Sequence, residues 1–189
     1  MRIRHTRKML ATLALMGLTV AVVPSSAVAY DDSRGASATV RDASGRTLGT
    51  VVFQPSGGKI LVAGRLSGLT AGFHGFHIHA VGQCVAPFTT AGGHLNPGGT
   101  THGNHAGDLP LLKVAADGRT SSVTESDTVT FADIFDADGA AIIIHASPDN
   151  YANIPADRYS TATGPGPDAA TLATGDAGGR VACGVIVRS

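Results

Sequence analysis

The sequence of 189 residues has no tryptophan, only two cysteines, few aromatic residues (5%) and a single glutamate against thirteen aspartates. Glutamate favours helices, whereas aspartate and the 25 glycines favour turns, so this composition excludes a coiled coil and a helical bundle. The apolar content of 43% excludes a disordered chain. Beyond the N-terminus the chain lacks any cluster of lysine and arginine, which argues against a nucleic-acid partner. Histidine is the abundant residue: seven of the eight lie between His74 and His145.

Residues 1–29 are predicted to be a secretory signal peptide that is cleaved. Four basic residues precede an apolar run from Met9 to Val23, and the segment ends in Ala27-Val28-Ala29, the small-x-small pattern that signal peptidase cuts. A membrane anchor is the alternative, but this run is short for a bilayer span of about 20 residues. Cleavage before Tyr30 would leave a single domain, residues 30–189, with ten basic and fourteen acidic residues and a net charge of −4. We therefore expect an exported protein with no membrane segment after cleavage.

Both cysteines, Cys84 and Cys183, lie in the predicted mature part. In an oxidising compartment one disulfide is the favoured interpretation, and two buried thiols or one metal-binding thiolate are the alternatives. Such a bond would close a loop of about 100 residues, for which chain entropy allows up to about 4 to 5 kcal/mol of stabilisation.

Short apolar or alternating segments separated by turn residues predict an all-β fold. The expected strands are 38–42, 47–54, 59–66, 73–80, 111–116, 121–131, 140–146 and 180–188. Their spacing is typical of a Greek-key β-barrel or sandwich of about eight antiparallel strands. Two loops, from Val81 to about Leu109 and from Ser147 to about Gly179, are too long for simple connections, so we expect them to be functional.

The histidines fall into groups that suit metal ions. His77 and His79 are two residues apart, so on a strand both project from the same face, while Phe76 and Ile78 face a core. Three further histidines and an aspartate follow in the Gly-rich first loop: His94, His102, His105 and Asp108. Three nitrogens and one carboxylate oxygen satisfy tetrahedral zinc, and a chance grouping in a solvated loop is the weaker interpretation.

The remaining histidines are weaker signals when they are taken one at a time. His145 ends an apolar strand, where a lone histidine is more often a hydrogen-bonded core residue than a ligand. Asp149 follows four positions later and could accept a hydrogen bond from a metal-binding imidazole. His74 has the parity of the core residues in its segment, so we expect it to be buried and structural.

Taken together, the segments GFHGFHIHA, GGHLNP, HAGDL, HASPDN and GDAGGRVACGVI resemble the copper,zinc superoxide dismutases of the exported bacterial kind. They occur in the family's order and extend from Gly72 to Ile186. The short spacing of His102 and His105 is similar to that of bacterial members.

The resemblance implies a site for each metal. It places copper on His77, His79, His94 and His145, and zinc on His94, His102, His105 and Asp108, so that His94 bridges the two ions. It also implies a disulfide between Cys84 and Cys183, an arginine beside the copper (Arg180), and an aspartate that links a copper ligand to a zinc ligand (Asp149). A homodimer is one assembly consistent with this resemblance.

The implied activity is the conversion of superoxide to O₂ and hydrogen peroxide by Cu(II)/Cu(I) cycling, with zinc structural and His94 a carrier of the proton. Because the mature chain would be negative, Arg180 and the metals would have to supply a local positive field for the anion. Two alternatives are a non-catalytic copper- or zinc-binding module of the same fold, and a zinc hydrolase. The complete ligand set argues against the first, and a zinc site closed by four protein ligands argues against the second.

Overall fold

A computed structural model describes residues 34–155, 160–161 and 164–189 of the protein. The predicted signal peptide lies outside these residues. The strands are β1 (Ala36–Asp42), β2 (Thr47–Ser56), β3 (Lys59–Ser67), β4 (Gly72–His74), β5 (Phe76–His79), β6 (Leu112–Val114), β7 (Arg119–Ser126), β8 (Ala141–His145), β9 (Ser160–Thr161), β10 (Gly164–Pro165), β11 (Arg180–Val185) and β12 (Val187–Arg188). The helical turns are η1 (Thr89–Ala91), α1 (Phe131–Ile134) and α2 (Thr171–Thr174).

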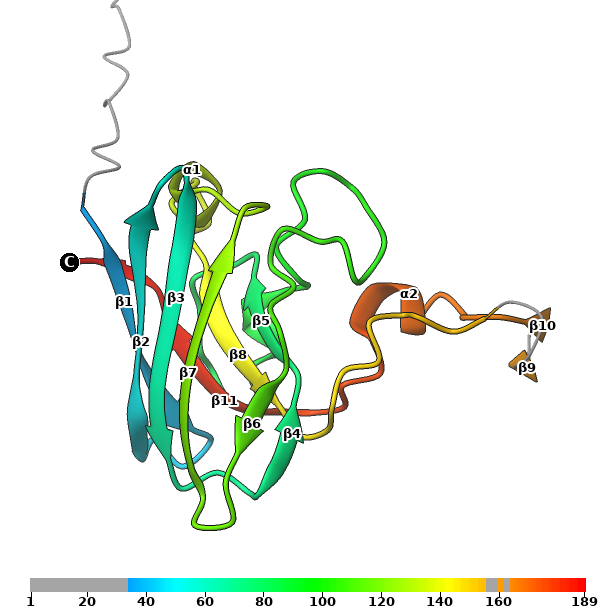
Figure 1. Ribbon diagram of the computed structural model, residues 1–189, viewed down its shortest axis with the longest axis horizontal. Coiled ribbons are helices and arrows are strands. Elements are labelled where there is room, and N and C mark those ends of the chain that lie inside the picture. Colours follow the sequence, from blue (N-terminus) through cyan, green and yellow to red (C-terminus); the bar gives the residue numbers. More distant parts are fainter. Residues whose placement is uncertain (1–33, 156–159, 162–163) are drawn as a thin grey trace, which may run out of the picture.

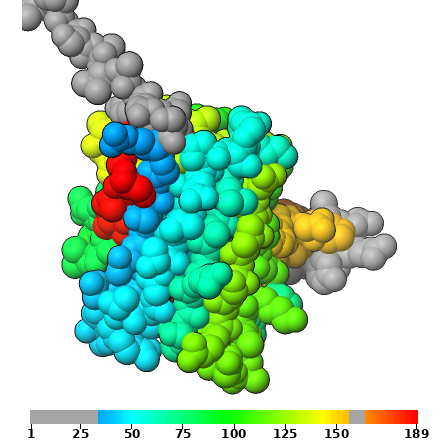
Figure 2. Space-filling view, turned by 60° about the vertical axis from the view of Figure 1, so that its left-hand side comes forward, coloured from blue at the N-terminus to red at the C-terminus, as the bar shows by residue number. Residues whose placement is uncertain are grey.

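One curled antiparallel sheet of eight strands dominates the molecule (Figure 1). Its order is β5-β8-β11-β1-β2-β3-β7, and β12 pairs with β1. The first three strands and β7 lie side by side and form one continuous outer face (Figure 2). Two small sheets, β4-β6 and β9-β10, complete the strand pairing. The prediction of an all-β fold of about eight antiparallel strands with two long loops is confirmed.

Alternation along the strands builds the core. In β1 every second residue up to Val40 is buried, and in β2 Val51 and Phe53 are fully buried while Val52 between them is only partly buried. In β8 all five residues are buried, because the core covers one face and the first long loop covers the other. Ile142 and Ile144 join the main core, whereas Ala141 and Ile143 join a smaller apolar cluster beside the disulfide. The outer face of β8 is therefore covered as well, and the side chains that project from it are buried.

The prediction of one continuous strand over 73–80 was wrong. This segment forms two strands that belong to different sheets. β4 pairs with β6, whereas β5 pairs with β8. The break falls at Gly75, whose N–H donates to Ser147 O (2.8 Å) and whose carbonyl accepts from His145 N–H (2.9 Å). A side chain on Gly75 would lie 2.6 Å from the Ala177 methyl group, so only glycine lets the second long loop come this close.

The strand predicted over 121–131 was also too long. β7 ends at Ser126, and the apolar residues that follow form the single turn α1. A reciprocal capping box starts this turn: Asp133 N–H donates to Thr130 Oγ1 (3.2 Å), and Thr130 N–H donates to Asp133 Oδ2 (2.9 Å). This local pairing outweighs the β propensity of the threonine and valine residues just before it.

The two long loops lie at the same side of the sheet as β5 and the end of β8 (Figure 1). The first contains η1, and the second contains β9, β10 and α2. Within the described part of the chain, no helix is long and apolar enough to cross a membrane.

Candidate metal centre

Strand pairing brings three of the predicted histidines onto one face. β5 runs antiparallel to β8, with His77 opposite Ile143 and His79 opposite Ala141. His145 has the same parity as Ile143, so its side chain leaves β8 on the same face as His77 and His79. This face points away from the main core and lies under the long loops, and all three histidines are buried.

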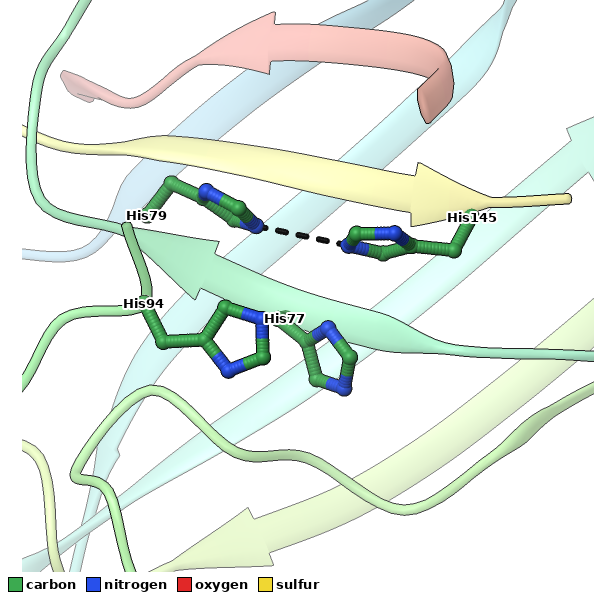
Figure 3. Close-up of side chains that lie close together, drawn as sticks. All are labelled: His77, His79, His94 and His145. Atoms are coloured by element: carbon green, nitrogen blue, oxygen red, sulfur yellow. Dashed lines mark hydrogen bonds between the residues drawn. The ribbon is translucent and has the colours of Figure 1, made fainter. Parts of the chain in front are cut away.

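The first loop adds a fourth imidazole to this group. The backbone of His94 forms an isolated antiparallel β-bridge with that of His79. The ring centroid of His94 lies 4.1 Å from that of His77 and 4.9 Å from that of His79. Figure 3 shows the four rings turned toward one another, with His79 Nε2 and His145 Nε2 only 3.4 Å apart. One nitrogen from each residue lies within 4.8 Å of the others. We call His77, His79, His94 and His145 the strand cluster.

Hydrogen bonds fix which nitrogen each strand histidine presents. His79 Nδ1–H donates to Gly92 O (2.9 Å) and His145 Nδ1–H donates to Gly178 O (3.1 Å), so Nε2 of each ring carries the free lone pair. His77 is the reverse: Nε2–H donates to an Asp149 carboxylate oxygen (2.5 Å). Its Nδ1 is fully buried and has no hydrogen-bond partner among the described residues. An unpaired buried nitrogen is costly, and a bound metal ion would satisfy it.

A second group, the loop cluster, comprises His94, His102, His105 and Asp108. The Nδ1 atom of His94 lies 3.2 Å from that of His102, 3.3 Å from that of His105 and 2.9 Å from Asp108 Oδ1. Ligands bonded at 2.0 to 2.1 Å to a tetrahedral ion are about 3.3 Å apart. The cluster is therefore already arranged as the corners of a zinc tetrahedron.

The Gly-rich loop holds the Asp108 carboxylate in place. Its Oδ2 accepts backbone N–H groups from Gly103 (2.7 Å) and His105 (3.0 Å), which leaves Oδ1 for the cluster. Although burial raises the pKa of this carboxyl, hydrogen bonds from His102 and His94 hold it well below its usual range. Asp108 is therefore ionised and supplies the negative charge that a divalent ion needs.

Asp149 connects the two clusters, as the resemblance implied. One oxygen accepts from His77 of the strand cluster, and the other accepts from His102 Nε2–H of the loop cluster (2.7 Å). The N–H of Tyr151 also donates to Asp149 (2.6 Å). A side chain at Gly175, a left-handed position with φ 58°, would collide with both Asp149 Oδ1 and His102 Nε2. Glycine is required there because the second loop packs directly on this bridge.

His102 of the loop cluster differs in protonation from His79 and His145 of the strand cluster. Burial lowers the pKa of His79 to about 2 and that of His145 to about 4, so both are neutral and can bind a cation. His102 behaves differently: burial lowers its pKa, but hydrogen bonds to Asp108 and Asp149 outweigh burial and raise it to about 9. Without metal, the loop cluster therefore holds a proton, and a metal ion would displace it.

Arg180 lies at the start of β11, directly opposite His145. Its side chain is half-buried, and its guanidinium donates to Phe88 O and Gly92 O, both at 2.5 Å. Gly92 O is also the acceptor for His79, so one carbonyl orients both a cluster histidine and the arginine. A pocket of about 490 Å³ opens over the strand cluster, and Arg180 is part of its wall.

The predicted disulfide between Cys84 and Cys183 is present, with the Cα atoms 5.7 Å apart. It ties the first loop to β11, close to the point where Arg180 holds the same loop. His74 is buried, as predicted, and its ring lies between His145 O (2.7 Å) and Thr70 O (2.9 Å). This structural histidine therefore supports the backbone of a strand-cluster residue.

The structure brings together every residue that sequence reasoning selected for the site. Sequence reasoning missed the backbone groups: the carbonyls of Gly92 and Gly178 orient two rings, and Gly175 leaves room for Asp149. It also missed Asp176, which lines the pocket with Arg180. The only signal for these residues was their place in the glycine-rich segments on either side of the ligands.

Comparisons with known proteins agree with this geometry. Residues 47–186 match the family described as Copper/zinc superoxide dismutase (SODC). The chain is 52% identical over 130 residues to "Superoxide dismutase [Cu-Zn]" from Mycolicibacterium paratuberculosis, a match that covers 62% of this chain and 57% of that relative's length. It is 44% identical over 182 residues to the protein of that name from Mycobacterium bovis, covering 86% of this chain and 76% of the relative.

Among solved structures, a "SOD-like protein" from Bacillus subtilis superposes with a TM-score of 0.65 at 29% identity, covering 80% of this chain and 97% of that one. The extent of the family match, together with the identities to the mycobacterial relatives, settles the classification. The chain belongs to the copper/zinc superoxide dismutase family.

Proposed function

We propose that the protein is a superoxide dismutase, which converts two superoxide anions and two protons into O₂ and hydrogen peroxide. The observation that carries the proposal is the pair of clusters that share His94, together with the pocket that opens beside Arg180 over the strand cluster. A protein that bound zinc alone would have no use for His77, His79 and His145.

In this assignment His77, His79, His94 and His145 hold copper, and His94, His102, His105 and Asp108 hold zinc. The donor sets fit these ions: four imidazole nitrogens suit a copper ion, while three imidazoles and a carboxylate suit tetrahedral zinc. When bound, copper supplies one-electron redox chemistry and zinc supplies a fixed positive charge. The unpaired buried Nδ1 of His77 supports the presence of an ion in the strand cluster.

The chain's own residues attract the substrate and handle the proton. The Arg180 guanidinium, fixed by two backbone carbonyls, attracts superoxide into the pocket and orients it. His94 presents Nδ1 to the loop cluster, which leaves Nε2, on the other side of the ring, for the strand cluster. Nε2 is therefore the atom at which His94 can take up a proton and donate it to the departing peroxide.

The test is metal analysis of the mature chain together with a superoxide-decay assay. We expect one copper and one zinc per chain and rapid decay of superoxide, with both copper binding and activity lost in His145→Ala. Activity without copper, or a fully metallated protein with no activity, would contradict the proposal.

We also propose that the protein is exported, with cleavage before Tyr30, and that it acts without a nucleic-acid or membrane partner. The N-terminal segment supports export, and the net charge of −4 after cleavage argues against nucleic acid. Intact mass of the protein recovered outside the cytoplasm would show a chain starting at Tyr30. For the assembly we propose a homodimer, in line with the resemblance, which sedimentation of the mature protein would test.

A further inference from the structure

The pocket over the strand cluster contains two opposed charges. Among the described residues that line it, Arg180 is the only one with a guanidinium and Asp176 is the only one with a carboxylate. The two flank the short stretch Ala177–Gly179, whose Gly178 carbonyl accepts from His145. An anion that approaches the strand cluster therefore meets Asp176 as well as Arg180.

The carboxylate of Asp176 is fixed but not neutralised. Its Oδ2 accepts hydrogen bonds from Asn150 Nδ2 (2.6 Å) and Thr171 Oγ1 (2.9 Å), and both donors are uncharged. The backbone N–H of Asp176 donates to Thr174 Oγ1 (3.2 Å), which holds the residue in a left-handed conformation with φ 55°. Among the residues that the structure describes, no lysine or arginine forms an ion pair with it.

Three side-chain and backbone contacts thus hold a negative charge at the wall of a pocket that takes an anion. If Asp176 served only to join the loop segments, an asparagine would accept the same hydrogen bonds without repelling the substrate. Repulsion by a fixed charge grows with the charge of the ligand, so it separates anions of different valence.

We propose that Asp176 is a specificity-determining residue, which discriminates against polyvalent anions such as phosphate in favour of a monoanion. The proposal rests on the proposed function, because superoxide is the monoanion in question. A unit charge about 10 Å away in a water-like medium changes the affinity for a monoanion about twofold and that for a dianion about fourfold. Salt screens this effect, because the Debye length falls to about 10 Å at 0.1 M ionic strength.

The test uses Asp176→Asn in the copper- and zinc-loaded protein, because asparagine keeps an acceptor oxygen and removes the charge. Azide serves as the monoanion, titrated through the Cu(II) absorption spectrum, and inorganic phosphate at pH 8 serves as the dianion, titrated by calorimetry. Both titrations are run at low and at high ionic strength. Asp117→Asn is the matched control, since it removes the same charge from the exposed turn between β6 and β7. Thr171→Val removes one hydrogen bond to Asp176 and keeps its charge.

We expect Asp176→Asn to bind azide about twofold and phosphate about fourfold more tightly at low ionic strength, and to match the wild type at high ionic strength. Asp117→Asn and Thr171→Val should leave both affinities unchanged. Equal gains for azide and phosphate, no gain at all, or the same gain in Thr171→Val would overturn the proposal. These affinities do not depend on turnover, so a protein that bound anions as expected but failed to dismutate superoxide would contradict the proposed function alone.

Discussion

The strand cluster and the loop cluster share His94 but are held by different forces. In the strand cluster, His77, His79 and His145 stand on β5 and β8, whose opposite face is the main core. The loop cluster stands on a segment without strands, and its hydrogen bonds run between Asp108, the histidines and two backbone N–H groups. Core packing therefore fixes the first cluster before metal arrives, whereas the second depends on a balance of charges that a metal ion would complete.

The largest effect should come from removing one ligand from each cluster in turn. His145→Ala should reduce activity by more than about 100-fold and abolish copper binding, because the strand cluster then loses a nitrogen that nothing replaces. His105→Ala should instead lose zinc and keep copper, since the three strand histidines remain in place. Metal content and superoxide decay measured on both variants test the division. Equal loss of both metals in both variants would show that the clusters do not form separately.

A methyl group at Gly175 should damage both clusters at once. In Gly175→Ala the new Cβ collides with Asp149 and His102, so the bridge between the clusters breaks, and we expect affinity for both metals to fall about 10- to 100-fold. Gly45→Ala is the control, because Gly45 also has a left-handed φ (85°) but open space around its Cβ position. Competition with a chelator measures the metal affinities of both variants. If Gly45→Ala lost as much affinity, backbone strain rather than the Asp149 bridge would be responsible.

Replacing Arg180 should slow the reaction with superoxide and leave metal binding by both clusters unchanged. We expect Arg180→Ile to lower kcat/KM about tenfold and to weaken its dependence on ionic strength, because the positive charge in the pocket wall is lost. Unchanged kinetics at low salt would remove Arg180 from substrate attraction. A loss of copper in this variant would mean that its bonds to Phe88 and Gly92 carbonyls matter more than its charge.

The smallest expected effect is on the stability of the metal-free protein, which the histidines of the two clusters should make dependent on pH in opposite directions. His79 and His145 have folded-state pKa values of about 2 and about 4, below the unfolded value near 6.5, so the unfolded chain binds protons first. Above pH 6.5 the two histidines do not weaken the fold. Below pH 6.5 the free energy of unfolding decreases by about 1 kcal/mol per histidine for each pH unit. The pKa of His102 is raised to about 9 in the folded chain, so protonated His102 stabilises the fold fully below pH 6.5. This stabilisation is lost as the pH rises through 9.

Denaturant unfolding of the metal-free chain at pH 5, 6.5 and 9 should therefore show the greatest stability near pH 6.5. In His102→Gln the loss of stability between pH 6.5 and 9 should disappear while the acid-side loss remains. A loss on the alkaline side that survives this substitution would contradict the assignment of that limb to His102.

The same contrast explains what the sequence could predict. The parity of His77 and His79 is a local property of a strand, so their common face follows from spacing alone. The ligands of the loop cluster were predicted because they are close together in the chain. Local competition was harder to foresee, as at Thr130, where a capping box turns an apolar run into a helix. Gly75 likewise breaks a strand only because Ala177, about a hundred residues away in the chain, packs against it.

The backbone contributions to the site could not be predicted for the same reason. Gly92 O and Gly178 O become acceptors only after the two loops have folded over the sheet, and nothing in the residue type of a glycine marks its carbonyl. Asp149 was found because it follows His145 closely, whereas Asp176 was missed because its role depends on a pocket formed by distant segments.

The central claim is that two differently built clusters form one binuclear centre through His94. Anomalous diffraction from crystals of the mature protein, recorded at the copper and the zinc absorption edges, tests it most directly. The account predicts copper among His77, His79, His94 and His145, zinc among His94, His102, His105 and Asp108, and both ions bonded to the ring of His94. A single metal site, or copper and zinc with no shared histidine, would contradict it.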